Sequence, residues 1–121
     1  MTGNLYVAKI RYDADFDLLS IRRPAFKTTY NVTIGDINLE FFHDQVIGIN
    51  VADALDFLKK SFSGYKISKE QLLKIDKAKI GFITSGTSLV VIFLFVLPNK
   101  EVLEARYMLP VVSREVLAIT A

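Results

Sequence analysis

Hydrophobic and polar residues alternate along most of the chain, a pattern that is typical of strands with one buried face. The segments that alternate in this way are 5–12, 17–23, 27–34, 37–41, 46–49, 79–84 and 101–109. Short turns containing Asp, Pro or Gly separate them, because these residues favour reversals of the backbone. The pattern therefore predicts an antiparallel sheet.

The spacing of apolar residues changes to a helical one after residue 50. It predicts a helix from Val51 to about residue 62, capped by Asn50. The apolar positions on the buried stripe of this helix are Val51, Ala54, Leu55, Leu58 and Phe62. A second, short helix is expected to start at Ser68, since Ser68 and Gln71 have the spacing of a capping box.

The length of the chain, 121 residues, predicts one domain, 1–121, with a single core. The fold we expect is α+β, with an antiparallel β-sheet of six to eight strands and two helices packed on one face or end. Hydrophobic residues make up 51% of the chain and the mean hydropathy is +0.33, both high for a soluble chain. Either the core is unusually complete, or another subunit covers part of the surface.

The segment 88–97 differs from the other predicted strands because both of its faces are apolar. An antiparallel sheet in a small protein usually leaves one face in water, so the second apolar face needs a cover. We expect that cover to be a second copy of the chain, in a homodimer joined through the C-terminal half. The residues expected at the interface are Val90, Ile92, Leu94 and Val96. The alternative is that the chain folds its own segment 111–119 over this face.

Several classes of protein are disfavoured by what the sequence lacks. No cysteine and one histidine occur, which removes disulfides, thiolate metal sites and most histidine-dependent catalytic sites. The longest apolar run, Leu89–Leu97, is too short for a membrane helix, which needs about 20 residues. The N-terminus has neither the basic start nor the long apolar stretch of a signal peptide. We therefore expect a cytoplasmic protein with no membrane partner and no cofactor.

The first half carries a motif that runs from a strand into Tyr-Asp-x-x-x-Asp-x-Leu-x-Ile and continues later with Val-x-Gly-Ile. The matching residues are Tyr12, Asp13, Asp17, Leu19, Ile21, Val46, Gly48 and Ile49. Through them, residues 8–58 resemble a family of short prokaryotic proteins catalogued as domain of unknown function 2283. The segment departs from the family pattern at 43–45, where a glycine-containing hairpin is replaced, and at Asn50, which replaces a glutamate. The resemblance implies a small α+β sheet protein and no particular activity.

Asp13, Asp15 and Asp17 have the spacing that begins a calcium-binding loop. The loop is broken, since Leu18 stands where a glycine is needed and Pro24 stands where a glutamate would complete the site. A solvated hairpin turn is the favoured interpretation of the three residues, because aspartates are standard turn residues. We therefore expect no tightly bound metal, and an enzyme that uses these carboxylates is kept as one alternative function.

His43 is expected in an exposed turn with Asp44. A general base or a metal ligand needs partner groups, and the sequence places no nucleophile beside this histidine. Since no catalytic set is found, we expect a non-enzymatic, self-associating protein that serves as an assembly or regulatory module.

Seven lysines lie between Lys59 and Lys79, with Glu70 and Asp76 as the acidic residues among them. Such a segment is typical of a nucleic-acid surface, but also of the solvated faces of two helices. The lysines expected to make contacts are Lys59, Lys60, Lys66 and Lys69. Nucleic-acid binding through segment 59–79 is the first alternative function, ahead of the carboxylate-dependent enzyme, although the small net charge of +2 does not favour it.

Overall fold

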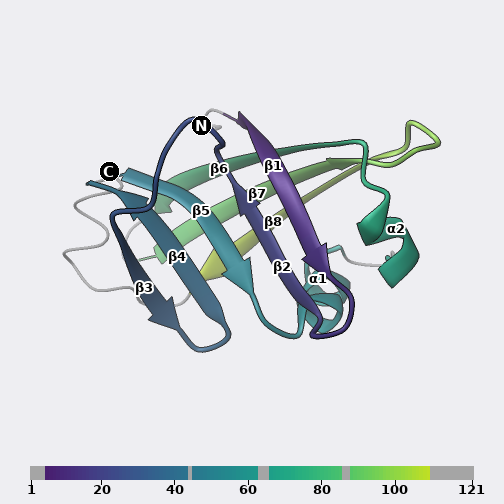
Figure 1. Cartoon of the computed structure of the whole chain (residues 1–121), viewed down its shortest axis with the longest axis horizontal. Coiled ribbons are helices and arrows are strands. Elements are labelled where there is room, and N and C mark those ends of the chain that lie inside the picture. The colour runs from purple at the N-terminus through teal and green to yellow at the C-terminus, as the bar shows by residue number, and fades with distance from the viewer. Residues whose placement is uncertain (1–4, 44, 63–65, 86–87, 110–121) are drawn as a thin grey trace.

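The computed structural model describes residues 5–43, 45–62, 66–85 and 88–109. Its strands are β1 Tyr6–Asp13, β2 Leu18–Arg22, β3 Tyr30–Ile34, β4 Ile37–Phe42, β5 Gln45–Val51, β6 Lys77–Ser85, β7 Ser88–Val96 and β8 Val102–Leu109. Its helices are α1 Ala54–Ser61 and α2 Lys69–Leu73. The described strands form one antiparallel sheet of eight, in the order β3-β4-β5-β2-β1-β6-β7-β8 (Figure 1). The prediction of an α+β fold with six to eight antiparallel strands is confirmed.

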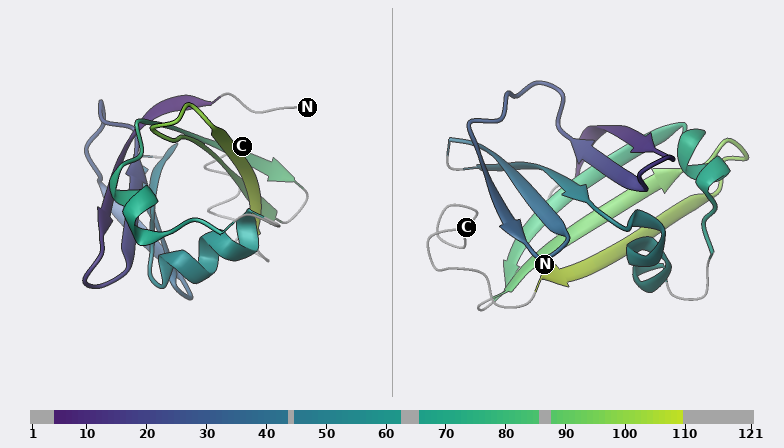
Figure 2. Two further views of the ribbon diagram at one scale, coloured as in Figure 1. Left: turned by 90° about the vertical axis from the view of Figure 1, so that its right-hand side faces the viewer. Right: turned by 60° about the horizontal axis from the view of Figure 1, so that its bottom comes forward.

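Strand β1 joins the two halves of the sheet. Its residues 6–8 pair with β6, whereas its residues 9–13 pair with β2. The strand thus passes from one half to the other, and the sheet curls into a half-barrel (Figure 2). One half contains β2 to β5 and the other contains β6 to β8. Both halves turn an inner face towards a shared core and an outer face away from it.

The inner face of the curled sheet is filled by the apolar side chains that the alternating pattern predicts. Leu19 and Ile21 on β2 are fully buried, as are Phe93 and Phe95 on β7. Side chains at successive positions of a strand point to opposite faces, so β2 carries Ser20 and Arg22 outwards, whereas the outer face of β7 is apolar. The predicted buried faces of these strands are therefore confirmed.

Helix α1 lies at the open side of the half-barrel, next to the edge strand β8 (Figure 2). It buries Ala54, Phe57 and Leu58. The ring of Phe57 meets Phe93 edge to face, with centroids 5.7 Å apart, and its centroid lies 4.6 Å from that of Tyr107 on β8. The helix therefore completes the core where the strands leave it open.

The first helix begins at Ala54, and the prediction that Asn50 caps it is wrong. Asn50 belongs to β5, where it pairs with β2 on one side and β4 on the other. The residue before the helix is Asp53, which has a left-handed backbone with φ 51°. The capping carboxylate comes from the β1–β2 turn, where Asp17 accepts a hydrogen bond from the backbone N–H of Leu55 at 3.2 Å. A distant residue thus satisfies a free N–H of the first turn.

The predicted capping box of α2 is confirmed. Ser68 Oγ accepts a hydrogen bond from the Gln71 N–H at 3.1 Å, and Gln71 Oε1 accepts one from the Ser68 N–H at 2.9 Å. This helix contacts β1, whereas α1 contacts β8. The two helices are therefore not gathered on one clearly defined face of the sheet. Neither of them is long and apolar enough to cross a membrane.

Candidate functional site

The four side chains predicted at an interface lie on the outer face of β7. Ile92 is only 1% exposed, and Val90, Leu94 and Val96 are half-buried. The outer stripe of β7 is therefore partly shielded within a single chain. The alternative cover for this face, segment 111–119, lies outside the described residues.

Strand β8 is an edge of the sheet. It pairs with β7, and no other described strand lies along its second side. Its outward side chains, all exposed, are Val102, Glu104, Arg106 and Met108. A groove of about 440 Å³ is formed by residues 102–106 of β8 together with Ser61 and Phe62 at the end of α1. Residues 102–106 of this edge strand therefore border a groove, and α1 contacts the same strand.

A second hollow lies on the outer face of the other half of the sheet, and we call it the polar pocket. Its volume is about 530 Å³, and its walls come from β1, β2, β4, β5 and the loop between β2 and β3. The residues that line it are Lys9, Arg11, Ser20, Arg22, Pro24, Phe26, Lys27, Glu40 and Asn50. Strands far apart in the sequence therefore build one polar surface.

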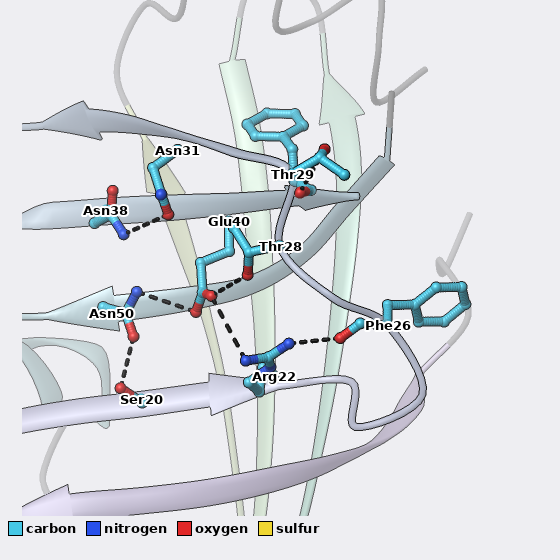
Figure 3. A network of polar contacts seen from close by, with 10 residues as sticks. Ser20, Arg22, Phe26, Thr28, Thr29, Asn31, Asn38, Glu40 and Asn50 are labelled. Carbon is cyan, nitrogen blue, oxygen red and sulfur yellow. Dashed lines mark hydrogen bonds and ion pairs between the residues drawn. The ribbon is translucent and has the colours of Figure 1, made fainter. Parts of the chain in front are cut away.

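Glu40 is the one buried charged side chain in the described part of the chain, with 8% exposed. Its carboxylate accepts hydrogen bonds from Thr28 Oγ1 and, at 3.1 Å, from Asn50 Nδ2 (Figure 3). The guanidinium of Arg22 lies 3.9 Å away. Ser20 Oγ donates to Asn50 Oδ1 at 2.6 Å. The hydrogen bonds from Thr28 and Asn50 and the nearby guanidinium of Arg22 stabilise the buried carboxylate of Glu40. This carboxylate forms the floor of the polar pocket.

Gly48 allows the strands at this floor to approach closely. It pairs with Arg22 on β2 and with Glu40 on β4. A Cβ at this position would lie 2.7 Å from Arg22 Cβ and 3.0 Å from a backbone oxygen of β2. Gly48 therefore has a steric role here, since any side chain would push Arg22 away.

The three aspartates of the broken calcium loop do not converge. Asp13 Oδ1 accepts hydrogen bonds from the backbone N–H groups of Asp15 and Phe16, as in an ordinary turn. Asp17 faces α1 instead and accepts a hydrogen bond from the Tyr12 hydroxyl at 2.6 Å. Among the residues that the structure describes, no three carboxylates or histidines are arranged to hold a metal ion. This cluster therefore gives the carboxylate-enzyme alternative no assembled site.

Tyr12 is expected to make stability depend on pH in the alkaline range. Burial, followed by the hydrogen bond to Asp17, raises the pKa of Tyr12 above its usual value of about 10. The folded state then holds the proton where the unfolded state releases it, so stability decreases as the pH rises above about 10. Urea unfolding at a series of pH values should show a weaker alkaline loss in Tyr12→Phe than in the wild type. Identical pH profiles for the two proteins would contradict this.

The four lysines considered for nucleic acid are not a uniform basic surface. Lys60 Nζ lies 2.9 Å from the carboxylate of Asp56, whose hydrogen bond raises the pKa of Lys60. Lys69 donates to a backbone carbonyl of the β1–β2 turn at 3.1 Å. Lys59 and Lys66 line a hollow of about 330 Å³ that Asp56 also lines. Two of the four lysines, Lys60 and Lys69, therefore already have an acidic or a backbone partner, and the structure adds no support for nucleic-acid binding.

His43 lies in the turn between β4 and β5, is exposed and has φ 53°. Its ring packs against Phe42 with centroids 4.4 Å apart, and its backbone N–H donates to Thr29 Oγ1 at 2.7 Å. Asp44, its sequence neighbour, lies outside the described residues. The contacts of His43 are those of a turn residue that packs against a neighbouring strand.

The sequence pattern indicated neither that β8 is the last of the described strands in the sheet nor that a polar pocket exists. The signal for the pocket was a set of polar residues on the outward positions of predicted strands, such as Ser20, Glu40 and Asn50. Outward polar residues are expected on any half-exposed strand. Without the order of the strands, nothing indicated that these residues meet.

Comparison with known proteins assigns no family to this chain. No family model matches it, no curated protein is significantly similar to it, and no solved structure is significantly similar to its fold. The resemblance of residues 8–58 to the family of unknown function stays a prediction.

Proposed function

We propose that this chain is a non-enzymatic, self-associating protein that forms a symmetric homodimer through the free edge of β8. The observation that carries the proposal is the order of the exposed side chains on this edge. Along the strand they are apolar, acidic, basic and apolar, namely Val102, Glu104, Arg106 and Met108. This order is complementary to its own reverse. Antiparallel pairing sets a strand against the reverse of its partner, so a second copy fits this edge.

A two-fold axis through Ala105 defines the register of the two strands. Glu104 then lies opposite the partner's Arg106. Val102 lies opposite the partner's Met108. The symmetry repeats each pair, which gives two ion pairs and two apolar contacts on the outer face. Cross-strand pairs of these kinds each contribute roughly 0.2–1 kcal/mol.

The neighbouring registers are unfavourable. An axis through Glu104 would set it against the partner's Glu104, and an axis through Arg106 would set two arginines against each other. Like charges directly opposite destabilise a strand pair. A two-fold axis could also pass between two successive residues of β8. It would then set a residue whose N–H and C=O point to the partner strand opposite one whose N–H and C=O point to β7. Hydrogen bonds between the two strands could not form in that register. The register centred on Ala105 is therefore the favourable one.

The outer stripe of β7 takes part in this arrangement as a second row. Within one chain, Val96 stands beside Val102, and Val90 stands beside Met108. Across the two-fold axis, Val96 and Val102 would be followed by the partner's Met108 and the partner's Val90. An apolar row would thus run without interruption across the joined sheets, which supports self-association through the C-terminal half.

The backbone of β8 gives a second reason for strand addition. An edge strand exposes N–H and C=O groups that can pair with another chain. A second copy of β8 would hydrogen-bond to these groups, as in other complexes formed by strand addition. The groove beside Ser61 and Phe62 leaves space along this edge. Pairing with a second copy would also remove an edge that other chains could add to.

Charge reversal on β8 tests the proposal. We expect the wild type to sediment as a dimer at micromolar concentration. Glu104→Arg should raise the dimer dissociation constant at least about tenfold, because it sets arginine against arginine. Arg106→Glu should act likewise through opposed glutamates. The double variant Glu104→Arg, Arg106→Glu exchanges the two charges and should restore the dimer, as measured by sedimentation equilibrium.

Lys79→Glu is the matched control. Lys79 is exposed on the outer face of β6, away from the edge, so its reversal should leave the dimer unchanged. Circular dichroism verifies that each variant is folded. The proposal is overturned by a wild type that is monomeric throughout the micromolar range, or by single reversals on β8 that dimerise as well as the wild type.

A further inference from the structure

Basic side chains converge on the polar pocket without matching acidic partners. Lys9 and Arg11 on β1 and Lys27 in the loop between β2 and β3 are exposed, and they form no ion pair with another described residue. Arg22 alone has a carboxylate nearby, that of Glu40 at 3.9 Å. Four cations around one carboxylate repel one another, and a bound anion would relieve that repulsion.

The loop that forms one wall of the polar pocket is held at both ends. The Arg23 N–H donates to a backbone oxygen of β5 at 2.9 Å, and the Thr29 N–H donates to one of β4 at 2.6 Å. At the end of β2, Arg22 Nη2 donates to the Phe26 carbonyl in the loop at 2.5 Å. The guanidinium of Arg23 lies 4.5 Å from the centroid of the Phe26 ring. The wall therefore exists before any ligand binds, which lowers the entropic cost of binding.

The floor of the polar pocket accepts hydrogen bonds. The Glu40 carboxylate receives hydrogen bonds from Thr28 and Asn50, and a carboxylate has about four acceptor positions. Acceptor capacity is therefore left for a hydroxyl group of a ligand. This carboxylate would also repel a bare anion. A ligand with hydroxyl groups beside its negative charge would instead pair its charge with the basic rim and donate hydrogen bonds from its hydroxyl groups to the floor.

We infer that the polar pocket binds a small phosphate ester that carries hydroxyl groups, of the sugar-phosphate class. The phosphate group would lie among Lys9, Arg11 and Lys27 at the rim, and the hydroxyl groups would face Glu40 and Asn50. The volume of about 530 Å³ falls within the range of roughly 300–1,000 Å³ for small-molecule sites. The inference does not depend on the dimer, because the polar pocket and the β8 edge lie on different halves of the sheet.

Calorimetric titration of the full chain tests the class of ligand. We expect ribose 5-phosphate to bind more tightly than inorganic phosphate, and ribose to give no measurable binding. No binding of ribose 5-phosphate, or equal binding of inorganic phosphate, would overturn the inference. A single-stranded oligonucleotide supplies the same phosphate chemistry from a nucleic-acid backbone. Tighter binding of the oligonucleotide than of ribose 5-phosphate would also overturn the small-molecule assignment.

Two sets of variants locate the site. Lys9→Ala together with Arg11→Ala should weaken ribose 5-phosphate binding at least about tenfold, because charge-assisted hydrogen bonds are lost. Lys77→Ala together with Lys79→Ala removes two exposed charges from the outer face of β6 and should leave binding unchanged. Equal weakening in both double variants would show non-specific charge attraction and overturn the inference.

Glu40→Gln tests the floor separately. It removes the charge that repels a bare anion while keeping a side chain of the same shape. The ratio between the affinities for ribose 5-phosphate and inorganic phosphate should fall relative to the wild type. An unchanged ratio in a folded variant would overturn the role of Glu40 in selecting a hydroxylated ligand.

Discussion

Replacing Phe93 with alanine should lower the free energy of unfolding by about 3–5 kcal/mol. Phe93 is fully buried, and its ring centroid lies 5.7 Å from that of Phe57 on α1 and 6.3 Å from that of Phe95. The substitution would leave a cavity between the sheet and the helix that closes it. Native proteins are stable by about 5–15 kcal/mol, so urea unfolding followed by circular dichroism should show a strongly destabilised protein.

Phe16→Ala provides the matched control for this experiment. It removes the same atoms at a position in the β1–β2 turn that is 75% exposed. The free energy of unfolding should change by less than about 0.5 kcal/mol, as at other surface sites. A comparable loss in Phe16→Ala and Phe93→Ala would contradict the position of Phe93 at the centre of the core.

Leu58→Ala should lower the free energy of unfolding by about 2–5 kcal/mol. The helical pattern predicted that both Leu55 and Leu58 face the core. The structure buries Leu58 completely, whereas Leu55 is half-buried and packs against the margin of the core. Leu55→Ala should therefore cost less than Leu58→Ala, because the cavity that it leaves is open to solvent. Urea unfolding of the two variants measures the difference.

Leu73→Ala serves as the control for these two substitutions, because Leu73 lies on α2 and is 58% exposed. It should change stability by less than about 0.5 kcal/mol. A larger loss in Leu55→Ala than in Leu58→Ala would show that α1 turns a different face to the sheet. That result would also contradict the contact between Phe57 and Phe93, because this contact and the burial of Leu58 need the same orientation of α1.

The two proposed binding surfaces can be tested independently, because they consist of different residues. The dimer depends on the charge order of β8, and the phosphate-ester site depends on β1, β2, β4, β5 and the adjoining loop. Charge reversal at Glu104 should leave ribose 5-phosphate binding unchanged, and alanine at Lys9 and Arg11 should leave the dimer unchanged. Loss of one function without the other would identify which surface a variant affects.

The sequence by itself determined the local elements and their buried faces. Leu19 and Ile21 alternate with polar residues, so their strand could be oriented without knowing its neighbours. Ser68 and Gln71 stand three positions apart, which is all that a capping box requires. These features depend on residues that are close in the chain, and a periodic pattern is sufficient to predict them.

Tertiary structure decided which elements meet. Strand β2 pairs with β5, although the β3–β4 hairpin lies between them in the sequence. Strand β1 pairs with β2 on one side and with β6 on the other. That order brings Glu40 together with Ser20 and Asn50, and it leaves β8 as an edge. It also brings Asp17 to the start of α1, where it replaces the local cap predicted from Asn50. An alternating pattern is compatible with any neighbouring strand, because strand order depends on hydrogen bonds and packing between distant segments.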